Sequence, residues 1–521
     1  MKSFGVPLKI RFQNGSLHNN LLSHIRLIVF IKNTGVRSVI KSTVANMKLS
    51  LHNTLTRNSS FIRPMDGTTL RFYCCGPTVY GPAHIGNLRT FVLQDVFRRL
   101  VEFLGIQTCH VRNVTDVDDK TIRESQQAGL PLAVFTDKWR AKFEADCSAL
   151  NILQPHHSPS AVAHVEDQIC LIQQLIKKDH AYADGNGSVY FRINSFAGYG
   201  KLSRLNRSGV RKNASARLND NDEYGKESWQ YFVLWKAWKP EDGSNHWQSP
   251  WGRGRPGWHI ECSAMSMRYL GESFDLHSGG VDLIFPHHEN EIAQSEAATG
   301  EPFVQHWLHV AHLRVDGEKM SKSLGNLFVL DEVVARGHSP EALRYLLISG
   351  HYRQPLNFRW ESLTAAASSL ARLHRFTAGV EHDLLTYQGQ NALETTVFTP
   401  ALEALCEDLN TPKALGALHR ALLSLKHSAA GEQAPIRRDL ARILQLLGLP
   451  ATSQQPSTQA TIPPAIIALA NQRQAARAAR NWETSDLLRS TLSDAGWEVR
   501  DSSDGFELKQ TQTPPLMRST L

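Results

Sequence analysis

The sequence predicts an α/β protein whose first two thirds form a nucleotide-binding domain and whose last third is mainly helical. Two observations predict the first part. The apolar run 70–75 is typical of a buried strand, and a Gly/Pro turn and a helix that opens near Gly86 follow it directly. Such a segment directs backbone N–H groups and the positive end of the helix toward a bound phosphate. Beyond residue 330 the apolar spacing becomes that of helices.

The helix after the turn carries apolar residues spaced as on a face that packs on a sheet: Leu93, Val96, Phe97, Leu100, Val101 and Leu104. Residues 47–150 are therefore predicted to form the first half of a Rossmann-like domain. Three acidic residues follow a short second strand in this half: Asp116, Asp118 and Asp119. They lack calcium-loop spacing, so a capped loop is favoured over a magnesium site.

Residues 151–250 are predicted to form an insertion, after which residues 251–330 return to the Rossmann-like domain. Within the insertion, the stretch 206–217 is basic and Gly/Ser-punctuated, which indicates a loop. Its charge is compatible with a solvated loop and with an RNA contact, and the residues leave both open.

The C-terminal third is predicted to contain a helical bundle over residues 331–450, a polar linker over 451–464 and a small α+β domain over 465–521. Thr411 and Pro412 are typical of an N-cap and first helical position. The last segment reads as helices within 466–492 and a hairpin within 497–509.

Four residues from three distant segments are candidate metal ligands: Cys75, Cys262, His287 and Glu291. His287 and Glu291 are four apart, so a helix would place them on one face. Thiolate, imidazole and carboxylate donors favour zinc over iron or magnesium. No CxxC pair is present, and two small buried thiols with a helix-capping histidine fit the residues equally well. His288 competes with His287 for the ligand position.

Two short segments together predict an ATP site. The first is Pro82-Ala-His84-Ile-Gly86-Asn87, at the strand-to-helix turn. The second is Glu318-Lys319-Met320-Ser321-Lys322-Ser323, a cationic loop suited to closing over phosphates. Each alone is compatible with an ordinary turn or a solvated surface.

The pair resembles the HIGH and KMSKS signatures of class I aminoacyl-tRNA synthetases. The second segment matches letter for letter, whereas Asn87 stands where the family usually has a second histidine. Asn still donates a hydrogen bond to phosphate or ribose. The resemblance implies that His84, Asn87, Lys319 and Lys322 are catalytic, with His84, Asn87 and Lys322 binding ATP.

The segments 73–80, 257–265 and 285–294 resemble the zinc segments of the cysteinyl-tRNA synthetase family. That resemblance implies zinc on Cys75, Cys262, His287 and Glu291, one ion per subunit, with the substrate thiolate bound to the metal. Thr78 and Trp258 would complete the substrate pocket. The implied substrates are L-cysteine, ATP with Mg²⁺, and tRNA(Cys), and no protein ligand for Mg²⁺ is readable.

The resemblance covers about residues 48–510 and extends to the C-terminal tail. There it implies a small anticodon-binding domain in which Arg477, Trp482, Asp486 and Asp501 contact the tRNA anticodon. Two competitors share some of these features. A ligase joining cysteine to an amino sugar should lack the tail, and a non-catalytic RNA-binding paralogue should have lost a loop lysine or a zinc ligand.

Composition says less about partners than the net charge of +8 suggests. Residues 1–46 hold seven of the 57 basic residues and no acidic one, so the rest is nearly neutral. That stretch fits an organellar transit segment or an extension before a start at Met47; the second is favoured, and with it the cytoplasm. Seven irregularly spaced cysteines argue for a reducing compartment, and no run is long enough to span a membrane. A monomer is expected.

Overall fold

The computed structural model describes residues 47–205, 230–321, 324–378, 380, 393–424, 430–450, 464–479, 481–494, 497–502 and 505–510. The chain divides into two compact units, Met1–Ser453 and Gln454–Leu521. Predictions that fall on other residues lie outside the described part: the extension 1–46, the basic loop 206–217, Lys322 and nearly all of the linker 451–464.

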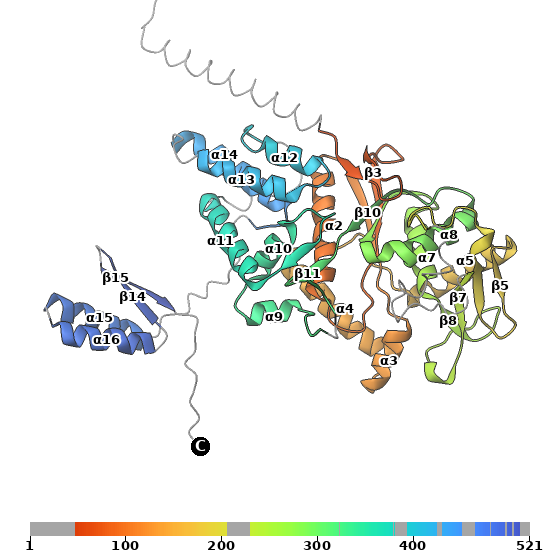
Figure 1. Ribbon diagram of the computed structural model, residues 1–521, viewed down its shortest axis with the longest axis horizontal. Coiled ribbons are helices and arrows are strands. Elements are labelled where there is room, and N and C mark those ends of the chain that lie inside the picture. Colours follow the sequence, from red (N-terminus) through yellow and green to blue (C-terminus); the bar gives the residue numbers. More distant parts are fainter. Residues whose placement is uncertain are drawn as a thin grey trace, which may run out of the picture. The chain divides into compact units, whose positions relative to one another are not determined.

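The centre of the first unit is a four-stranded parallel sheet in the order β10-β9-β3-β4. Strands β3 (Thr69–Cys74) and β4 (Gln107–Arg112) precede the predicted insertion, and β9 (Phe274–Gly280) and β10 (Val304–Val310) follow it. The predicted strand 70–75 is therefore present, one residue earlier. A parallel sheet assembled from two separated halves, with helices around it, is the predicted Rossmann-like α/β fold (Figure 1).

The alternation of side chains along β3 sorts them between two cores. Phe72 and Cys74 share one core with the long helix α2 (Ile85–Phe103), whereas Tyr73 and Cys75 share another with α7 (Trp258–Leu270). Cys74 has no exposed surface, which makes it a core residue. Cys75, directly after the strand, thereby faces α7.

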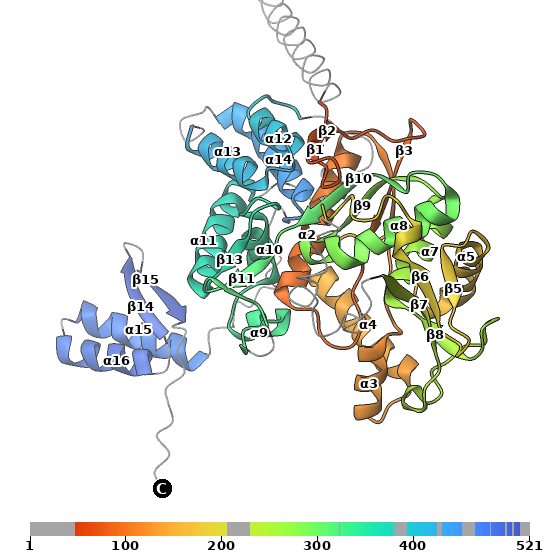
Figure 2. The ribbon, with the colours of Figure 1, turned by 45° about the vertical axis from the view of Figure 1, so that its right-hand side comes forward.

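The segment between the halves contains helices and a second, antiparallel sheet in the order β5-β6-β7-β8. Figure 2 shows this sheet beside α5, α7 and α8. Asp118 caps α3 by accepting from the Thr121 N–H (2.7 Å), and Asp119 pairs with Lys236 and Arg255, so the capped-loop prediction is confirmed. The elements of this segment, besides α7, are α3 (Asp119–Gln127), α4 (Leu132–Ala149), η1 (Val162–His164), α5 (Val165–Lys177), β5 (Ala181–Ala183), β6 (Val189–Arg192), η2 (Ile193–Ser195), β7 (Tyr231–Ala237), η4 (Pro240–Asp242) and β8 (Gly254–Pro256). Between β9 and β10, in the second half, lie η5 (Val281–Leu283), η6 (Ile284–His288) and α8 (Glu289–Thr299).

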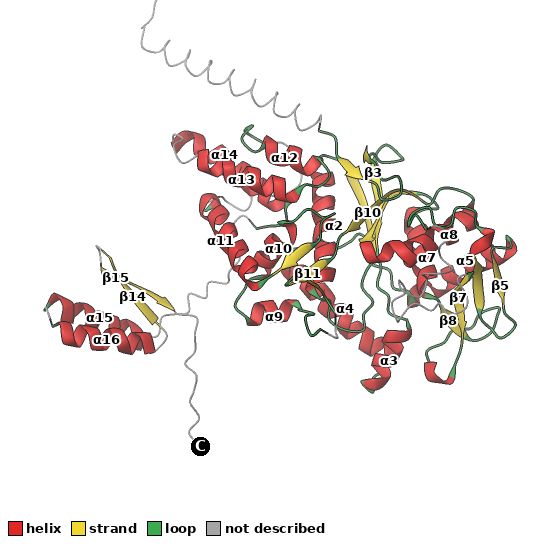
Figure 3. Cartoon of the chain, in the orientation of Figure 1, coloured by secondary structure: helices red, strands yellow, loops and turns green. Residues whose placement is uncertain are grey.

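A small sheet, β12-β11-β13, leads from the parallel sheet into a helical bundle (Figure 3). Asp95 on α2 binds Arg344 on α10, which joins the bundle to the α/β core. The small sheet and the bundle consist of β11 (Leu313–Val315), β12 (Glu318–Lys319), α9 (Leu330–Ala335), α10 (Pro340–Ile348), β13 (Leu356–Phe358), α11 (Trp360–Thr377), α12 (Thr399–Cys406), α13 (Thr411–Ser424) and α14 (Ala430–Leu446). Near the start of the described chain, β1 (Ser50–His52) and β2 (Ser59–Phe61) form a separate two-stranded sheet.

The second unit consists of two helices and a hairpin, which the sequence predicted. The elements are α15 (Pro464–Ala478), α16 (Trp482–Asp494), β14 (Trp497–Ser502) and β15 (Gly505–Gln510). They share a small core of Ile466, Ala470, Leu492, Trp497 and Val499. Among the described residues of the whole chain, no helix has the length and apolarity needed to cross a membrane.

Candidate active site

Two buried thiols meet at the carboxyl end of β3. Cys75 follows the strand, and Cys262 lies in the second turn of α7. Their Sγ atoms are 4.0 Å apart, and the two residues are 7% and 2% exposed. The core shared by β3 and α7 brings them together because both side chains project into it. This distance lets both sulfurs reach one metal ion.

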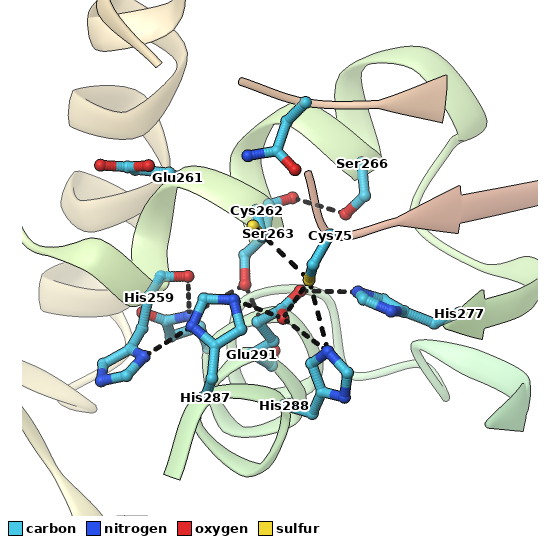
Figure 4. A network of polar contacts seen from close by, with 12 residues as sticks. Cys75, His259, Glu261, Cys262, Ser263, Ser266, His277, His287, His288 and Glu291 are labelled. Atoms are coloured by element: carbon cyan, nitrogen blue, oxygen red, sulfur yellow. Dashed lines mark hydrogen bonds and ion pairs between the residues drawn. The ribbon is translucent and has the colours of Figure 1, made fainter. Parts of the chain in front are cut away.

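His287 and Glu291 complete a four-residue group with the two cysteines (Figure 4). His287 lies in the π-helical turn η6, and Glu291 lies in α8, so they do not share the single regular helix that their spacing suggested. The predicted proximity is nevertheless present, because His287 Nε2 is 3.1 Å from Glu291 Oε1. One ligand atom from each of the four residues lies within 4.8 Å of the others.

A second, overlapping group uses Cys75 and Glu291 with two other histidines, His277 and His288. His288 Nε2 is 3.3 Å from Cys75 Sγ and 3.9 Å from Glu291 Oε1. The backbone allows this approach because position 279 is glycine: a Cβ there would lie 2.8 Å from the His288 ring. The geometry thus accommodates either His287 or His288 beside the shared pair.

Three further histidines surround the group, and sequence reasoning missed them. His277 Nε2 is 2.9 Å from Glu291 Oε2, His259 Nδ1 is 3.0 Å from His287 Nδ1, and His288 Nδ1 is 2.7 Å from His309 Nε2. They come from β9, α7 and β10. The order of the strands brings His277 and His309 to the group, whereas His259 lies three residues before Cys262 on α7. Such contacts orient ligand side chains.

Burial sets the ionisation of this cluster. It raises the pKa of the Cys75 thiol and of the Glu291 carboxyl well above their usual ranges, and it lowers the pKa of His287 and His288 well below theirs. These pKa shifts apply to the four side chains without a bound cation. A divalent ion would favour thiolate, carboxylate and neutral imidazole at once, which are the forms that bind metals.

Thr78 and Trp258, the predicted pocket residues, both adjoin this cluster in the chain. Trp258 opens α7, and its ring centroid is 4.3 Å from that of His287. Thr78 lies three residues after Cys75 in a segment held to the residues that follow β4: the Val79 N–H donates to the Thr115 carbonyl (3.1 Å). Both residues are half-buried.

His84 and Asn87 cap the N-terminus of α2 by reciprocal hydrogen bonds. The Asn87 N–H donates to His84 Nδ1 (3.2 Å), and the His84 N–H donates to Asn87 Oδ1 (3.3 Å). Burial lowers the pKa of His84, while the negative charge of Asp282 opposes this shift. Asp282 is an exposed acid after β9 that sequence reasoning did not single out. The helix end is one to which an anion binds favourably.

The described part of the cationic loop returns to this helix end. Lys319 is exposed at the end of β12, and the Asn326 side chain bridges the loop through the Lys319 carbonyl (3.1 Å) and the Ser321 N–H (2.8 Å). The Ile85 N–H then donates to the Phe328 carbonyl (2.9 Å). The structure therefore brings the predicted segments around His84 and Lys319 to one place.

Comparison with known proteins identifies the family. A model of the tRNA synthetases class I (C) catalytic domain matches residues 61–368. The cysteine–tRNA ligase of Opitutus terrae is 48% identical over 471 residues, which span 89% of this chain and 99% of that protein. The chain belongs to the cysteine–tRNA ligase family. The Chlamydia muridarum cysteine–tRNA ligase is 42% identical over 485 residues, which span 89% of this chain and all of that protein.

Family membership confirms the predicted enzyme class, a class I aminoacyl-tRNA synthetase that activates an amino acid with ATP and joins it to tRNA. The solved Mycobacterium tuberculosis methionyl-tRNA synthetase in complex with methionyl-adenylate shares the fold. Its TM-score is 0.51 at 16% identity, over 73% of this chain and 89% of that one.

The predicted tRNA contacts lie in the second unit. Trp482 opens α16 and is 56% exposed, with the Arg477 guanidinium 5.7 Å from its ring centroid. Asp486 is exposed one turn further along the same helix. Asp501 belongs to β14, and its side chain lies outside the described part of the structure. The contact of these four residues with tRNA remains a prediction.

Proposed function

We propose that this member of the family selects L-cysteine with a zinc ion held by Cys75, Cys262, His287 and Glu291. One observation carries the proposal: four side chains of three chemical types, from three distant segments, place ligand atoms within 4.8 Å of one another in a buried site. Two sulfurs, one imidazole and one carboxylate form a donor set that suits zinc. His287 is preferred over His288 because it belongs to the group that includes both cysteines.

The bound zinc would coordinate the side-chain sulfur of the substrate, favouring a thiolate over the nearly isosteric hydroxyl of serine. Discrimination by shape alone is weak for such isosteres. Trp258 and Thr78 would border this position and hold the rest of the amino acid. The Trp258 ring packs against His287 at a tilt of 32°, so it would also keep that imidazole oriented.

The N-terminus of α2 and the cationic loop would bind the triphosphate of ATP, with His84 and Asn87 on one side and Lys319 and Lys322 on the other. Attack of the cysteine carboxylate on the α-phosphorus forms cysteinyl-adenylate and releases pyrophosphate. The lysines would stabilise the charge that develops on the departing group. Mg²⁺ would accompany ATP, and no protein ligand is assigned to it.

The second unit would read tRNA(Cys). Trp482 would stack on an unpaired base, Arg477 would contact phosphate or a base edge, and Asp486 and Asp501 would accept from base amino groups. The enzyme is proposed to act as a cytoplasmic monomer, with residues 1–46 outside the working part. If they are instead a transit segment, the location would be an organelle.

The deciding experiment is cysteine-dependent exchange of labelled pyrophosphate into ATP by the purified chain. It is run before and after removal of zinc by a chelator, with serine offered at equal concentration. Exchange that requires cysteine, ignores serine, stops on chelation and returns with zinc supports the assignment. Serine-supported exchange, or full activity without metal, contradicts it.

A further inference from the structure

Arg89 joins α2 to two chain segments that lead into the sheet next to the cationic loop. It lies one turn into α2 from Ile85, has no exposed surface, and donates four hydrogen bonds to backbone carbonyls. Nη1 donates to Ala311 (2.6 Å) and His312 (3.0 Å), and Nη2 donates to His351 (3.1 Å) and Gln354 (2.8 Å). Each arm of the guanidinium thus binds a different segment of the chain.

These two segments feed the small sheet that carries Lys319. Ala311 and His312 connect β10 to β11, and residues 351–354 connect α10 to β13. β11 and β13 pair in parallel, and β12, which ends at Lys319, pairs with β11. The planar fork of Arg89 therefore fixes the start of β11 and of β13 against the helix whose first residues are capped by His84.

The loop also contacts the helix end directly. A Cβ at Gly86 would lie 3.2 Å from Met320 Sδ, so a side chain at position 86 would crowd the loop. Small shifts of the sheet relative to α2 would change this approach. The hydrogen bonds of Arg89 tie both segments that lead into the sheet to α2.

The guanidinium is not held by an acid, since it forms no ion pair among the described residues. Burial lowers the pKa of Arg89 to about 10, which still leaves it charged at neutral pH. Four carbonyl dipoles compensate the charge, and they do so only while both segments stay in place. An ammonium group offers three donors without a planar fork, so lysine does not reproduce this arrangement.

We propose that Arg89 is a positioning residue for adenylate formation, which sets the distance between the α2 end and the cationic loop. The inference rests on the proposed ATP-binding role of both segments. Adenylate formation needs the two segments on one triphosphate, whereas transfer to tRNA occurs after pyrophosphate has left. Arg89 should therefore influence the first step and not the second. A misplacement of about 1 Å can slow an enzyme roughly 10²-fold.

The test compares Arg89→Lys with a matched variant, Arg344→Lys, in the full chain. Arg344 is 1% exposed and also donates to carbonyls, including those of Leu447 (2.8 Å) and Leu150 (2.8 Å), but it lies away from the helix end. Rapid-quench assays measure cysteinyl-adenylate formation against ATP concentration, and single-turnover assays measure transfer from isolated enzyme–adenylate to tRNA(Cys). Active-site titration and zinc content normalise both.

For Arg89→Lys, adenylate formation per active site should fall roughly tenfold to hundredfold, with transfer and zinc content unchanged. Arg344→Lys should lower the melting temperature and leave both normalised rates unchanged. Equal loss of both steps, or of neither, in Arg89→Lys overturns the inference. If that variant does not fold, the same two rates are measured for Arg89→Gln, whose side-chain NH₂ group keeps two hydrogen-bond donors. Failure of the wild type to form adenylate would instead refute the proposed function.

Discussion

Cys75 Sγ and Cys262 Sγ lie 4.0 Å apart, although 187 residues separate the two cysteines in the chain. Neither spacing nor a local motif creates this contact. It arises because side chains that follow β3 and side chains on one face of α7 enter the same core. The pair is the part of the candidate metal site that a single substitution can dismantle most selectively.

Cys262→Ser should abolish zinc retention and cysteine-dependent pyrophosphate exchange together, because a hydroxyl is a poor substitute for a thiolate ligand. Zinc is measured by atomic absorption after gel filtration. Cys170→Ser, which removes an exposed thiol, serves as the control and should change neither. A metal-free Cys262→Ser variant with full activity would refute the zinc pocket.

Several features were predictable because they depend on nearby residues. The apolar spacing after Gly86 gave helix α2, and the interval between His287 and Glu291 gave their proximity. A helical turn does join the two residues, but it is not one regular α-helix: the π-helical turn η6 ends at His288 and α8 starts at Glu289.

Other features depend on strand order, which the sequence does not display. His277 reaches Glu291 because β9 lies between β10 and β3. In the sequence, Arg89 is indistinguishable from any polar residue of an amphipathic helix. Its hydrogen-bond partners lie in the segments before β11 and β13, which only the fold brings close to it. Residues that act through tertiary contacts of this kind lack a periodic signal.

Lys322→Ala should reduce adenylate formation about 10²-fold to 10³-fold, a range typical for loss of one group that stabilises developing charge. Zinc content should not change, because the variant leaves the metal ligands intact. The readout is pyrophosphate exchange beside metal analysis. Lys413→Ala removes an exposed lysine from the bundle and is the matched control. Parallel loss of zinc and exchange in Lys322→Ala would show that the loop assignment is wrong.

Asp95→Asn should lower the free energy of unfolding by about 3–5 kcal/mol at pH 7, because two buried arginines lose their counter-charge. Burial favours the neutral acid, but Arg344 and Arg99 outweigh it and hold the pKa of Asp95 below its usual value. The unfolded pKa is about 3.9. The stabilisation is therefore complete above that value and is lost as the pH falls through the folded pKa.

Denaturant titrations of wild type and Asp95→Asn between pH 8 and about pH 3 test this sign. The difference in unfolding free energy should be constant down to about pH 4 and then shrink. Glu166→Gln, on the exposed first turn of α5, should show no such difference. A gap that widens in acid would mean that folding raises the pKa of Asp95, and would contradict this prediction.

Trp482→Ala should weaken aminoacylation of tRNA(Cys) and leave pyrophosphate exchange unchanged, since the side chain belongs to the C-terminal unit, whose sequence carries none of the proposed ATP or metal residues. Loss of one base stack corresponds to about 1–3 kcal/mol, or roughly a 5-fold to 150-fold rise in KM for tRNA. Leu487→Ala is a matched control, because Leu487 is 68% exposed on the same helix. If both variants raise KM equally, apolar area rather than stacking accounts for the effect. If neither does, the 56% exposed indole is a surface feature of α16, and the RNA contact of this unit lies elsewhere.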